Sequence, residues 1–145
     1  MTSNQNPEQK ARDTIDALLR QAGWTVQDNK KIDLNAGKGQ AVRAYQTDVG
    51  PAAYVLFVDK KAGGVIEAKR EEEGQRLTSH ESQTEGYATA KLKWVNNKAP
   101  LPFRYESTGI ITRFTDGRDP KPRSREVFSF HRPATLKEWL SQDAS

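Results

Sequence analysis

The feature that most constrains this fold is a pair of short apolar segments joined by a polar turn. Residues 53–58 read Ala-Tyr-Val-Leu-Phe-Val, and residues 64–69 read Gly-Val-Ile-Glu-Ala-Lys. Runs this short and this apolar are typical of strands that are buried on both faces. We therefore expect a β-hairpin in the middle of a sheet, with Glu67 and Lys69 at the end of its second strand.

Glu67 and Lys69 are two residues apart, so in a strand their side chains share a face. A carboxylate and an ammonium group at one sheet edge can bind a hard divalent cation and direct a water molecule toward phosphorus. The same pair can instead form a structural salt bridge, and Glu-x-Lys by itself favours that simpler interpretation. Asp59, the nearest acid, falls beside the turn, where aspartate is common.

The rest of the pattern mixes helices with strands. Apolar residues at helical spacing predict an amphipathic helix that begins near Pro7 and stops at Gly23. A second helix is expected from residue 79 or 83 to about residue 94, and a closing helix with Thr135 as its N-cap. Further strands are predicted at residues 40–45, 103–106, 109–114 and 126–130. This mixture indicates an α/β fold.

Composition excludes several classes of protein. None of the 145 residues is cysteine, which excludes disulfides, thiolate zinc sites and a cysteine nucleophile. The chain lacks a leader pattern and any apolar stretch near the roughly 20 residues of a membrane span. We therefore expect a soluble, cytoplasmic protein with one domain over residues 1–145, of which residues 1–6 are disordered. The formal charge of +4 favours a nucleic-acid partner only weakly.

Several segments resemble one known family. They are residues 42–59, residues 64–70 (Gly-Val-Ile-Glu-Ala-Lys-Arg), residues 106–109, 112–116 and 119–125, and residues 130–133 (Phe-His-Arg-Pro). Together they are similar to the N-terminal endonuclease domain of the restriction (HsdR) subunit of type I restriction-modification enzymes. This resemblance implies the restriction-endonuclease-like PD-(D/E)xK fold, a mixed central β-sheet flanked by helices. It also implies Mg²⁺-dependent cleavage of double-stranded DNA, without sequence specificity of its own.

The resemblance assigns roles to individual residues. Glu67 matches the family's metal-binding glutamate, and Lys69 matches its catalytic lysine. Gln83 and Tyr87 match its Gln-x-x-x-Tyr motif, whose spacing puts both residues on one face of a helix. Tyr87 also fits a core aromatic residue. His131 is expected to be a structural hydrogen-bonding residue.

Two positions depart from the family pattern. Ala53 stands where the family has its main metal-binding aspartate, and Ala44 stands where it tends to have a second acid. Because a missing carboxylate removes a charged ligand from a small Mg²⁺ site, we expect this chain to bind metal poorly and to cut little or no DNA. Engineered inactivation and natural decay both explain the alanines. Glu8 is either a peripheral carboxylate or a residue that stabilises the helix dipole.

Basic residues outside the hairpin are candidates for contacts with DNA phosphates. They are Arg70, Arg76, Lys91, Lys93, Arg123 and Arg125, and each also fits a solvated surface charge. The sequence has no Gly-x-x-x-x-Gly-Lys-Ser/Thr loop, so helicase and translocase domains are expected to be absent, with ATP used only by the full-length subunit. The implied partners are double-stranded DNA, the motor domains of the same subunit, and the modification and specificity subunits. The alternatives are a natural non-cutting DNA- or partner-binding module of the same fold, and a structural module that docks onto the motor.

Overall fold

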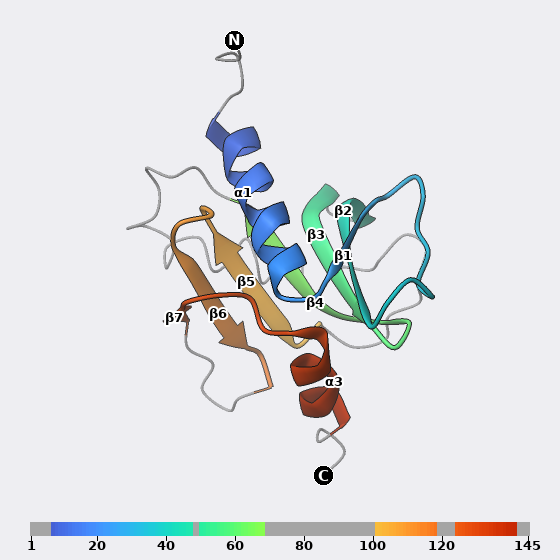
Figure 1. The fold of residues 1–145 in the computed structure, drawn as a ribbon. Helices are drawn as coiled ribbons and strands as arrows, with labels where there is room; N and C mark the ends of the chain where they lie inside the picture. The colour runs from blue at the N-terminus through green and yellow to red at the C-terminus, as the bar shows by residue number, and fades with distance from the viewer. Residues whose placement is uncertain (1–6, 48–49, 69–100, 119–123, 142–145) are drawn as a thin grey trace.

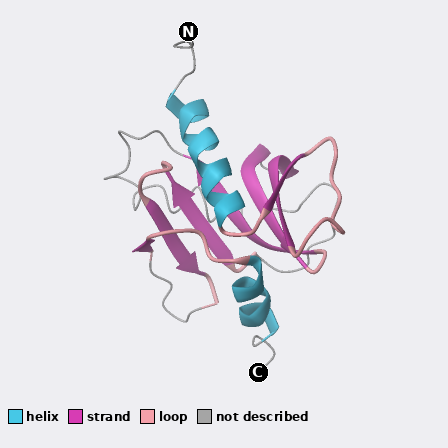
Figure 2. Cartoon of the chain, viewed as in Figure 1, coloured by secondary structure: helices cyan, strands magenta, loops and turns pink. Residues whose placement is uncertain are grey.

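A computed structural model of the chain describes residues 7–47, 50–68, 101–118 and 124–141. Its strands form one mixed sheet in the order β1-β2-β3-β4-β5-β6-β7 (Figure 1). The strands are β1 Thr25–Asp28, β2 Gly39–Thr47, β3 Gly50–Val58, β4 Lys61–Ala68, β5 Phe103–Ser107, β6 Thr112–Asp116 and β7 Arg125–Val127. Two pairs, β1 with β2 and β4 with β5, are parallel, and the others are antiparallel. Figure 2 shows one helix near each end of the described chain, with the strands between them in the sequence.

The predicted hairpin is confirmed at the centre of the sheet. Strands β3 and β4 pair in antiparallel register, and each has a further strand on its other side. Asp59 and Lys60 join them with φ angles of 56° and 67°, the left-handed conformation that tight two-residue hairpin turns require. Asp59 is therefore a turn residue, as the sequence indicated.

The first helix, α1, runs from Pro7 to Gln21 and confirms the predicted helix. It buries Ile15 and Leu19 against the sheet. Gly23 follows with a φ of 99°, a conformation that glycine adopts without steric cost and that commonly ends a helix.

The closing helix, α3, runs from Pro133 to Ser141, so the prediction of Thr135 as its N-cap was wrong. The carbonyl of Arg132 accepts the backbone N–H groups of Thr135 and Leu136, at 2.9 and 3.2 Å. The helix thus begins at Pro133, whose fixed φ and missing N–H suit a first helical position. The helix predicted near residues 79–94, and the terminal residues 1–6, lie outside the described residues.

Two predicted strands have different bounds in the structure. Strand β6 begins at Thr112 rather than residue 109, because the Thr108 hydroxyl accepts the N–H groups of Ile110 and Ile111 in a tight turn. Strand β7 ends at Val127 rather than residue 130, and Phe130 leaves the sheet to be buried in the core. The strands predicted at residues 40–45 and 103–106 are confirmed within β2 and β5.

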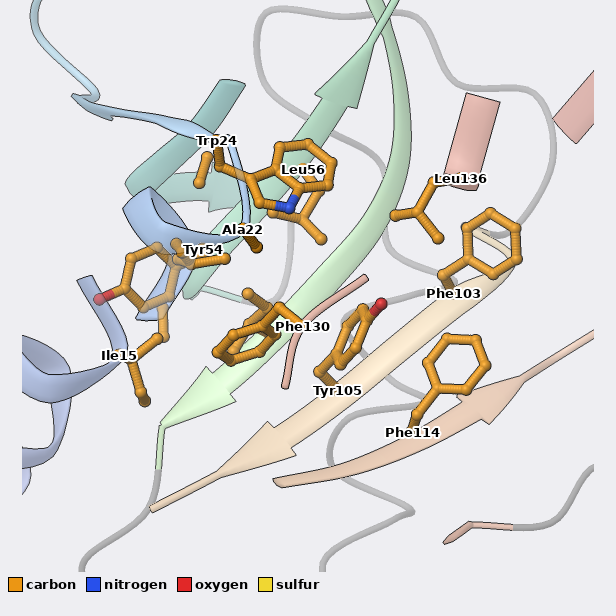
Figure 3. Close-up of a cluster of buried hydrophobic side chains, with 14 of the residues drawn as sticks. Ile15, Ala22, Trp24, Tyr54, Leu56, Phe103, Tyr105, Phe114, Phe130 and Leu136 are labelled. Carbon is orange, nitrogen blue, oxygen red and sulfur yellow. The ribbon is translucent and has the colours of Figure 1, made fainter. Parts of the chain in front are cut away.

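Each face of the sheet carries a buried apolar cluster. Beneath α1 and α3 lies a cluster of large side chains, shown in Figure 3, which we call the α1-side core. Its largest members include Ile15, Leu19, Trp24, Tyr54, Leu56, Ile66, Phe103, Tyr105, Phe114, Phe130 and Leu136. A second cluster contains Val42, Tyr45, Ala52, Val55, Phe57, Val65 and Leu101. Alternate residues of β3 thus enter different clusters, as expected of a central strand.

His131 is a structural hydrogen-bonding residue, as predicted. Its Nδ1 atom lies 2.6 Å from the Tyr105 hydroxyl, and its carbonyl accepts the Trp24 indole N–H at 2.8 Å. The imidazole ring also makes edge contacts with Phe114 and Trp139. His131 therefore links the segment before α3 to Tyr105 of β5 and to Trp24, which follows α1.

Among the described residues, no helix is both long enough and apolar enough to cross a membrane.

Candidate active site

Charged residues from four neighbouring strands pair with one another across half of the sheet. Glu67 of β4 pairs with Glu106 of β5, Glu106 pairs with Arg113 of β6, and Arg113 pairs with Glu126 of β7. Residues paired in this way have their side chains on the same face. A continuous line of charged positions therefore runs from the centre of the sheet to its β7 edge.

Ala53 and Ala44, the two residues that depart from the family pattern, extend this line of backbone positions into the other half of the sheet. The pair Tyr54↔Ile66, extended by one residue on each strand, puts Ala53 across from Glu67. Ala44 lies between the β2 residues that pair with residues 52 and 54, so it lies across from Ala53. We call this set the cross-sheet row. Its members are Ala44, Ala53, Glu67, Glu106, Arg113 and Glu126.

The two glutamates at the centre of the row are buried and face away from α1. Ile66, Ala68 and Tyr105 belong to the α1-side core, so strand alternation directs Glu67 and Glu106 to the opposite face. Glu67 is 9% exposed and Glu106 is 4% exposed. Two carboxylates thus lie side by side near the C-terminal ends of parallel strands.

The chemistry of this pair suits a hard divalent cation. Like charges at directly adjacent strand positions repel each other, and carboxylate oxygens are the ligands that Mg²⁺ prefers. Both residues have interaction partners, while the Oε2 atom of each is buried and accepts no hydrogen bond. Within the described ranges, no group of three or more Asp, Glu and His residues could hold a metal ion. Glu67 and Glu106 therefore fit part of such a site, and Ala53 contributes no ligand to it.

The regular alternation of faces breaks at the two alanines of the row. Tyr54 belongs to the α1-side core and Ala52 to the opposite cluster, although residues two apart in a strand normally share a face. On β2, Ala44 is exposed and has a φ of 54°, which is unusual for alanine. The Ala53 methyl group packs with the α1-side core although its backbone lies across from Glu67. Such irregularities are common next to active sites.

A third buried carboxylate lies beside this break, on the α1 face. Asp16 of α1 is 5% exposed and accepts hydrogen bonds from the Tyr54 hydroxyl at 2.5 Å and from Arg43 at 3.1 Å. Burial, followed by the hydrogen bond to Asp16, raises the pKa of Tyr54 well above its ordinary value. The phenol therefore stays protonated and remains a donor. This cluster anchors α1 to β2 and β3 next to Ala44 and Ala53.

The structure brings three of the predicted site positions together: Ala44, Ala53 and Glu67 lie in one row. Arg125 is described at the β7 edge, exposed, with its guanidinium 5.7 Å from the centroid of the Phe114 ring. Glu8 lies within α1. The remaining predicted residues lie outside the described part of the chain: Lys69, Arg70, Arg76, Gln83, Tyr87, Lys91, Lys93 and Arg123.

Sequence reasoning missed two buried acids, Glu106 and Asp16. Glu106 is the last residue of the strand predicted at residues 103–106, and Glu67 likewise lies near the end of its predicted strand. This shared position is a signal from which the sequence could have identified Glu106. Its importance depends on the parallel pairing of β4 with β5, two strands that residues 69–102 separate in the sequence. Asp16 stands among the apolar positions of α1, so its burial was also readable from the helical pattern.

Comparison with known proteins places these observations in a family context. No protein-family model matches the chain. The chain is similar to the endonuclease subunit of the type I restriction enzyme EcoKI from Escherichia coli (strain K12), with 28% identity over 185 aligned positions that cover 94% of this chain. It spans 16% of the length of that relative.

Two solved structures have a similar fold. One is a fragment described as an HsdR subunit of a type I restriction enzyme from Vibrio vulnificus YJ016, with a TM-score of 0.59 and 18% identity, covering 95% of this chain and 26% of that chain. The other is the type IIG restriction endonuclease BpuSI, with a TM-score of 0.55 and 16% identity, covering 99% of this chain and 17% of that chain. Together these similarities confirm the predicted resemblance to an HsdR endonuclease domain and the restriction-endonuclease-like α/β fold.

Proposed function

We propose that this HsdR-like chain is the DNA-cleavage domain of the restriction subunit of a type I restriction enzyme. Its reaction would be Mg²⁺-dependent hydrolysis of phosphodiester bonds in double-stranded DNA. The observation that supports this proposal is the backbone register of β2, β3 and β4, in which positions 44, 53 and 67, where the resemblance expects acids, lie on neighbouring strands beside the break in the alternation of faces. Similarity to an endonuclease subunit over 94% of the chain supports the same reaction.

The proposed chemistry divides between two strands of the hairpin and the residues that follow it. Glu67 would hold the cation from β4. An acid at position 53 would have to turn from the α1-side core to the face of Glu67 in order to hold it from β3. Mg²⁺, when bound, supplies a Lewis acid that polarises a phosphate and lowers the pKa of a water molecule. Lys69, two residues after Glu67 in the sequence, would orient the attacking water. Gln83 and Tyr87 would support contact with the DNA.

In this proposal, the chain as printed is catalytically impaired. Ala53 provides no oxygen ligand across from Glu67, and Ala44 provides none next to it. A Mg²⁺ site generally takes only one or two carboxylates from the protein, so the loss of one is a large fraction of its charge. We expect weak metal binding and little or no cleavage from this sequence.

The proposed partners follow from the larger proteins that this chain resembles. Because the chain spans 16% of the EcoKI subunit, the motor domains of the same subunit would be its covalent neighbours, and ATP would act on those domains. The modification and specificity subunits would select the target sequence. Phosphate contacts would come from basic residues. Arg125 is the described candidate, and Arg70, Arg76, Lys91, Lys93 and Arg123 are the others.

The two alanines also favour a second candidate function, a non-cutting module that binds DNA or a partner. In that case Glu67 would serve only a structural pair, and restoring acids at positions 44 and 53 would create no metal site. The first proposal predicts that acids at these positions create a metal site. The metal affinity of the isolated protein therefore distinguishes the two functions.

The test is the double variant Ala44→Glu, Ala53→Asp, compared with the parent chain. We expect the double variant to bind Mn²⁺, followed by electron paramagnetic resonance, at least about tenfold more tightly than the parent. With Mg²⁺ it should also nick supercoiled plasmid faster than the parent. A third variant, which adds Glu67→Gln to the double variant, is the matched control and should lose both gains.

Two results would contradict the proposal. One is nicking by the parent chain at the rate of the double variant, since the alanines would then be compatible with catalysis. The other is a folded double variant whose Mn²⁺ affinity equals that of the parent, which would favour the non-cutting module. The metal titration gives an answer even if cleavage requires the motor domains.

A further inference from the structure

We propose that a pocket beside the turn of the central hairpin binds the phosphate groups of an anionic ligand. The pocket has a volume of about 380 Å³, and three segments that are distant in the sequence line it. They are the loop between β1 and β2, the turn between β3 and β4, and the start of α3 (Figure 1). This inference goes beyond the proposed function and uses none of its residues.

The pocket lies at the opposite end of the hairpin from the cross-sheet row. Asp59 and Lys60 form the turn that joins β3 to β4, and Asp59 comes six residues after Ala53. At a rise of roughly 3.3 Å per residue in a strand, about 20 Å separate the turn from the row. A ligand in this pocket is therefore distinct from a cation at Glu67.

Each of the three segments contributes one lysine to the pocket. They are Lys38 from the loop, Lys60 from the turn and Lys137 from α3, and all three are exposed. Asp59 is the one acid among the described lining residues, so these residues carry a formal charge of +2. Within the described ranges, none of the three lysines takes part in an ion pair. The lining therefore favours an anion, and lysine binds phosphate as a point charge.

The start of α3 adds to this positive charge. Pro133 and Lys137 are four residues apart in the helix, so they lie on one face. The first turn of α3, which is described in full, has no acidic residue. The positive end of the helix dipole is therefore not offset by a side chain of that turn, and phosphate groups commonly bind at such helix ends.

Packing and hydrogen bonds hold the walls of the pocket in place. Gly39 lets the start of β2 approach α3, because a β-carbon at this position would lie 2.6 Å from the Pro133 Cβ atom. The Gln40 side-chain amide donates to the backbone carbonyls of Ala36 and Gly37, which fixes the loop. A site whose backbone is already ordered pays less conformational entropy when it binds a ligand.

Two sources of phosphate fit this chemistry. The volume of about 380 Å³ is near the lower end of the roughly 300–1,000 Å³ typical of small-molecule pockets. Leu34, Pro133 and Ala134 add an apolar part to the lining, which suits the carbon skeleton of a small phosphorylated molecule. The DNA backbone carries the same phosphate groups, so the experiment tests both sources.

The experiment compares the parent chain with Lys38→Gln, Lys137→Gln and Lys10→Gln. Pyrophosphate binding is measured by titration calorimetry in metal-free buffer, and binding of a short DNA duplex by fluorescence anisotropy. Removing one charge close to a phosphate should weaken binding about fivefold, so Lys38→Gln and Lys137→Gln should each show this loss. Lys10, an exposed lysine of α1, is the matched control with the same change in net charge. Its variant should bind as the parent does.

Ala134→Asp is a second test, in which folding and binding move in different directions. Ala134 is exposed in the first turn of α3, where an acid interacts favourably with the helix dipole. The variant should therefore keep or raise the midpoint of thermal denaturation, yet lose phosphate binding because its carboxylate repels the ligand. Ala134→Asn has a side chain of similar size without the charge, and it should still bind.

The two probes identify the source of the phosphate. A loss of pyrophosphate binding confined to the pocket variants supports a small phosphorylated ligand, and a loss of duplex binding confined to them supports the DNA backbone. Equal losses with Lys10→Gln would show a general attraction of anions to a basic protein and would overturn the inference. Failure of the parent chain to bind either probe would overturn it as well. Neither result bears on the cation site, which is tested by Mn²⁺ affinity.

Discussion

Two regions of this molecule bury carboxylates on opposite faces of the sheet, and they differ in what surrounds the charge. On the α1 face, Asp16 receives hydrogen bonds from Tyr54 and from the cationic side chain of Arg43. On the other face, Glu67 and Glu106 lie in direct register on parallel strands. The first carboxylate has a described cationic partner and a hydroxyl donor, whereas the second region has two carboxylates at paired positions of adjacent strands.

This difference separates an acid with a described structural role, Asp16, from the acid that we propose for a metal site, Glu67. A buried carboxylate with a cationic partner and a hydroxyl donor is stabilised in the folded protein without any ligand. A buried pair of carboxylates gains from an added positive charge, which a divalent cation provides. Removing Asp16 should therefore affect folding, and changing the row should affect metal binding.

The largest expected effect is on stability, from Asp16→Ala. This change removes two charge-assisted contacts, of which that to Arg43 is discounted because 41% of the Arg43 side chain is exposed. We expect the free energy of unfolding to fall by about 3 kcal/mol, measured by urea denaturation. In the Ala53→Asp background, Asp16→Ala should leave Mn²⁺ affinity unchanged. A loss of metal affinity without a loss of stability would show that the two regions are not distinct.

Ala53→Asp tests the proposed cation site and should act on stability through the cation. Without a divalent ion, a carboxylate introduced at a position that is 9% exposed should lower the free energy of unfolding by about 2 kcal/mol. Added Mg²⁺ should recover part of this loss, because an ion that binds only the folded state stabilises it. Thermal denaturation with and without Mg²⁺ measures both effects. A midpoint that does not respond to Mg²⁺ would contradict a cation site at this position.

Tyr54→Phe isolates one contact of the Asp16 region. Loss of the hydroxyl should lower the free energy of unfolding by about 1.5 kcal/mol at neutral pH. In the Ala53→Asp background, the same change should leave the Mn²⁺ affinity unchanged. Because the pKa of Tyr54 is raised in the folded state, its stabilisation is present below the unfolded pKa of about 10 and is lost as the pH rises above that value. Denaturation at pH 8 and at pH 11 should show a smaller alkaline loss for Tyr54→Phe than for the parent. An equal loss would assign the alkaline transition to other groups.

The smallest expected effect is a gain in stability from Ala44→Gly. The φ of 54° at Ala44 is strained for alanine and unstrained for glycine. Relief of that strain, partly offset by the greater entropy of glycine in the unfolded chain, should raise the free energy of unfolding by up to about 1 kcal/mol. Urea denaturation measures it, and Ala41→Gly on the same strand is the control that should destabilise. A destabilised Ala44→Gly variant would indicate that Ala44 is not strained in solution.

Much of the fold could be predicted because local rules decided it. The alternating clusters of β3, the stop at Gly23 and the turn at Asp59 follow from side-chain periodicity and backbone preference alone. The ends of β6 and β7 could not be predicted, since a hydroxyl cap from Thr108 and the burial of Phe130 override strand propensity there. The N-cap at α3 was misassigned because threonine is a good cap wherever the backbone permits one.

The candidate site was also predictable from the sequence only in part. By itself, the sequence determined that a buried hairpin carries Glu67, because two short apolar runs around a polar turn specify such a pair of strands. The register that sets the backbone of Ala53, rather than Asp59, across from Glu67 came from the structure, since a single bulge changes which residues are paired. Only the tertiary structure decided that Glu106 lies beside Glu67 and that Asp16 is neutralised on the opposite face. Those contacts join residues separated by dozens of positions, and pairing between strands distant in the chain depends on how the whole sheet assembles.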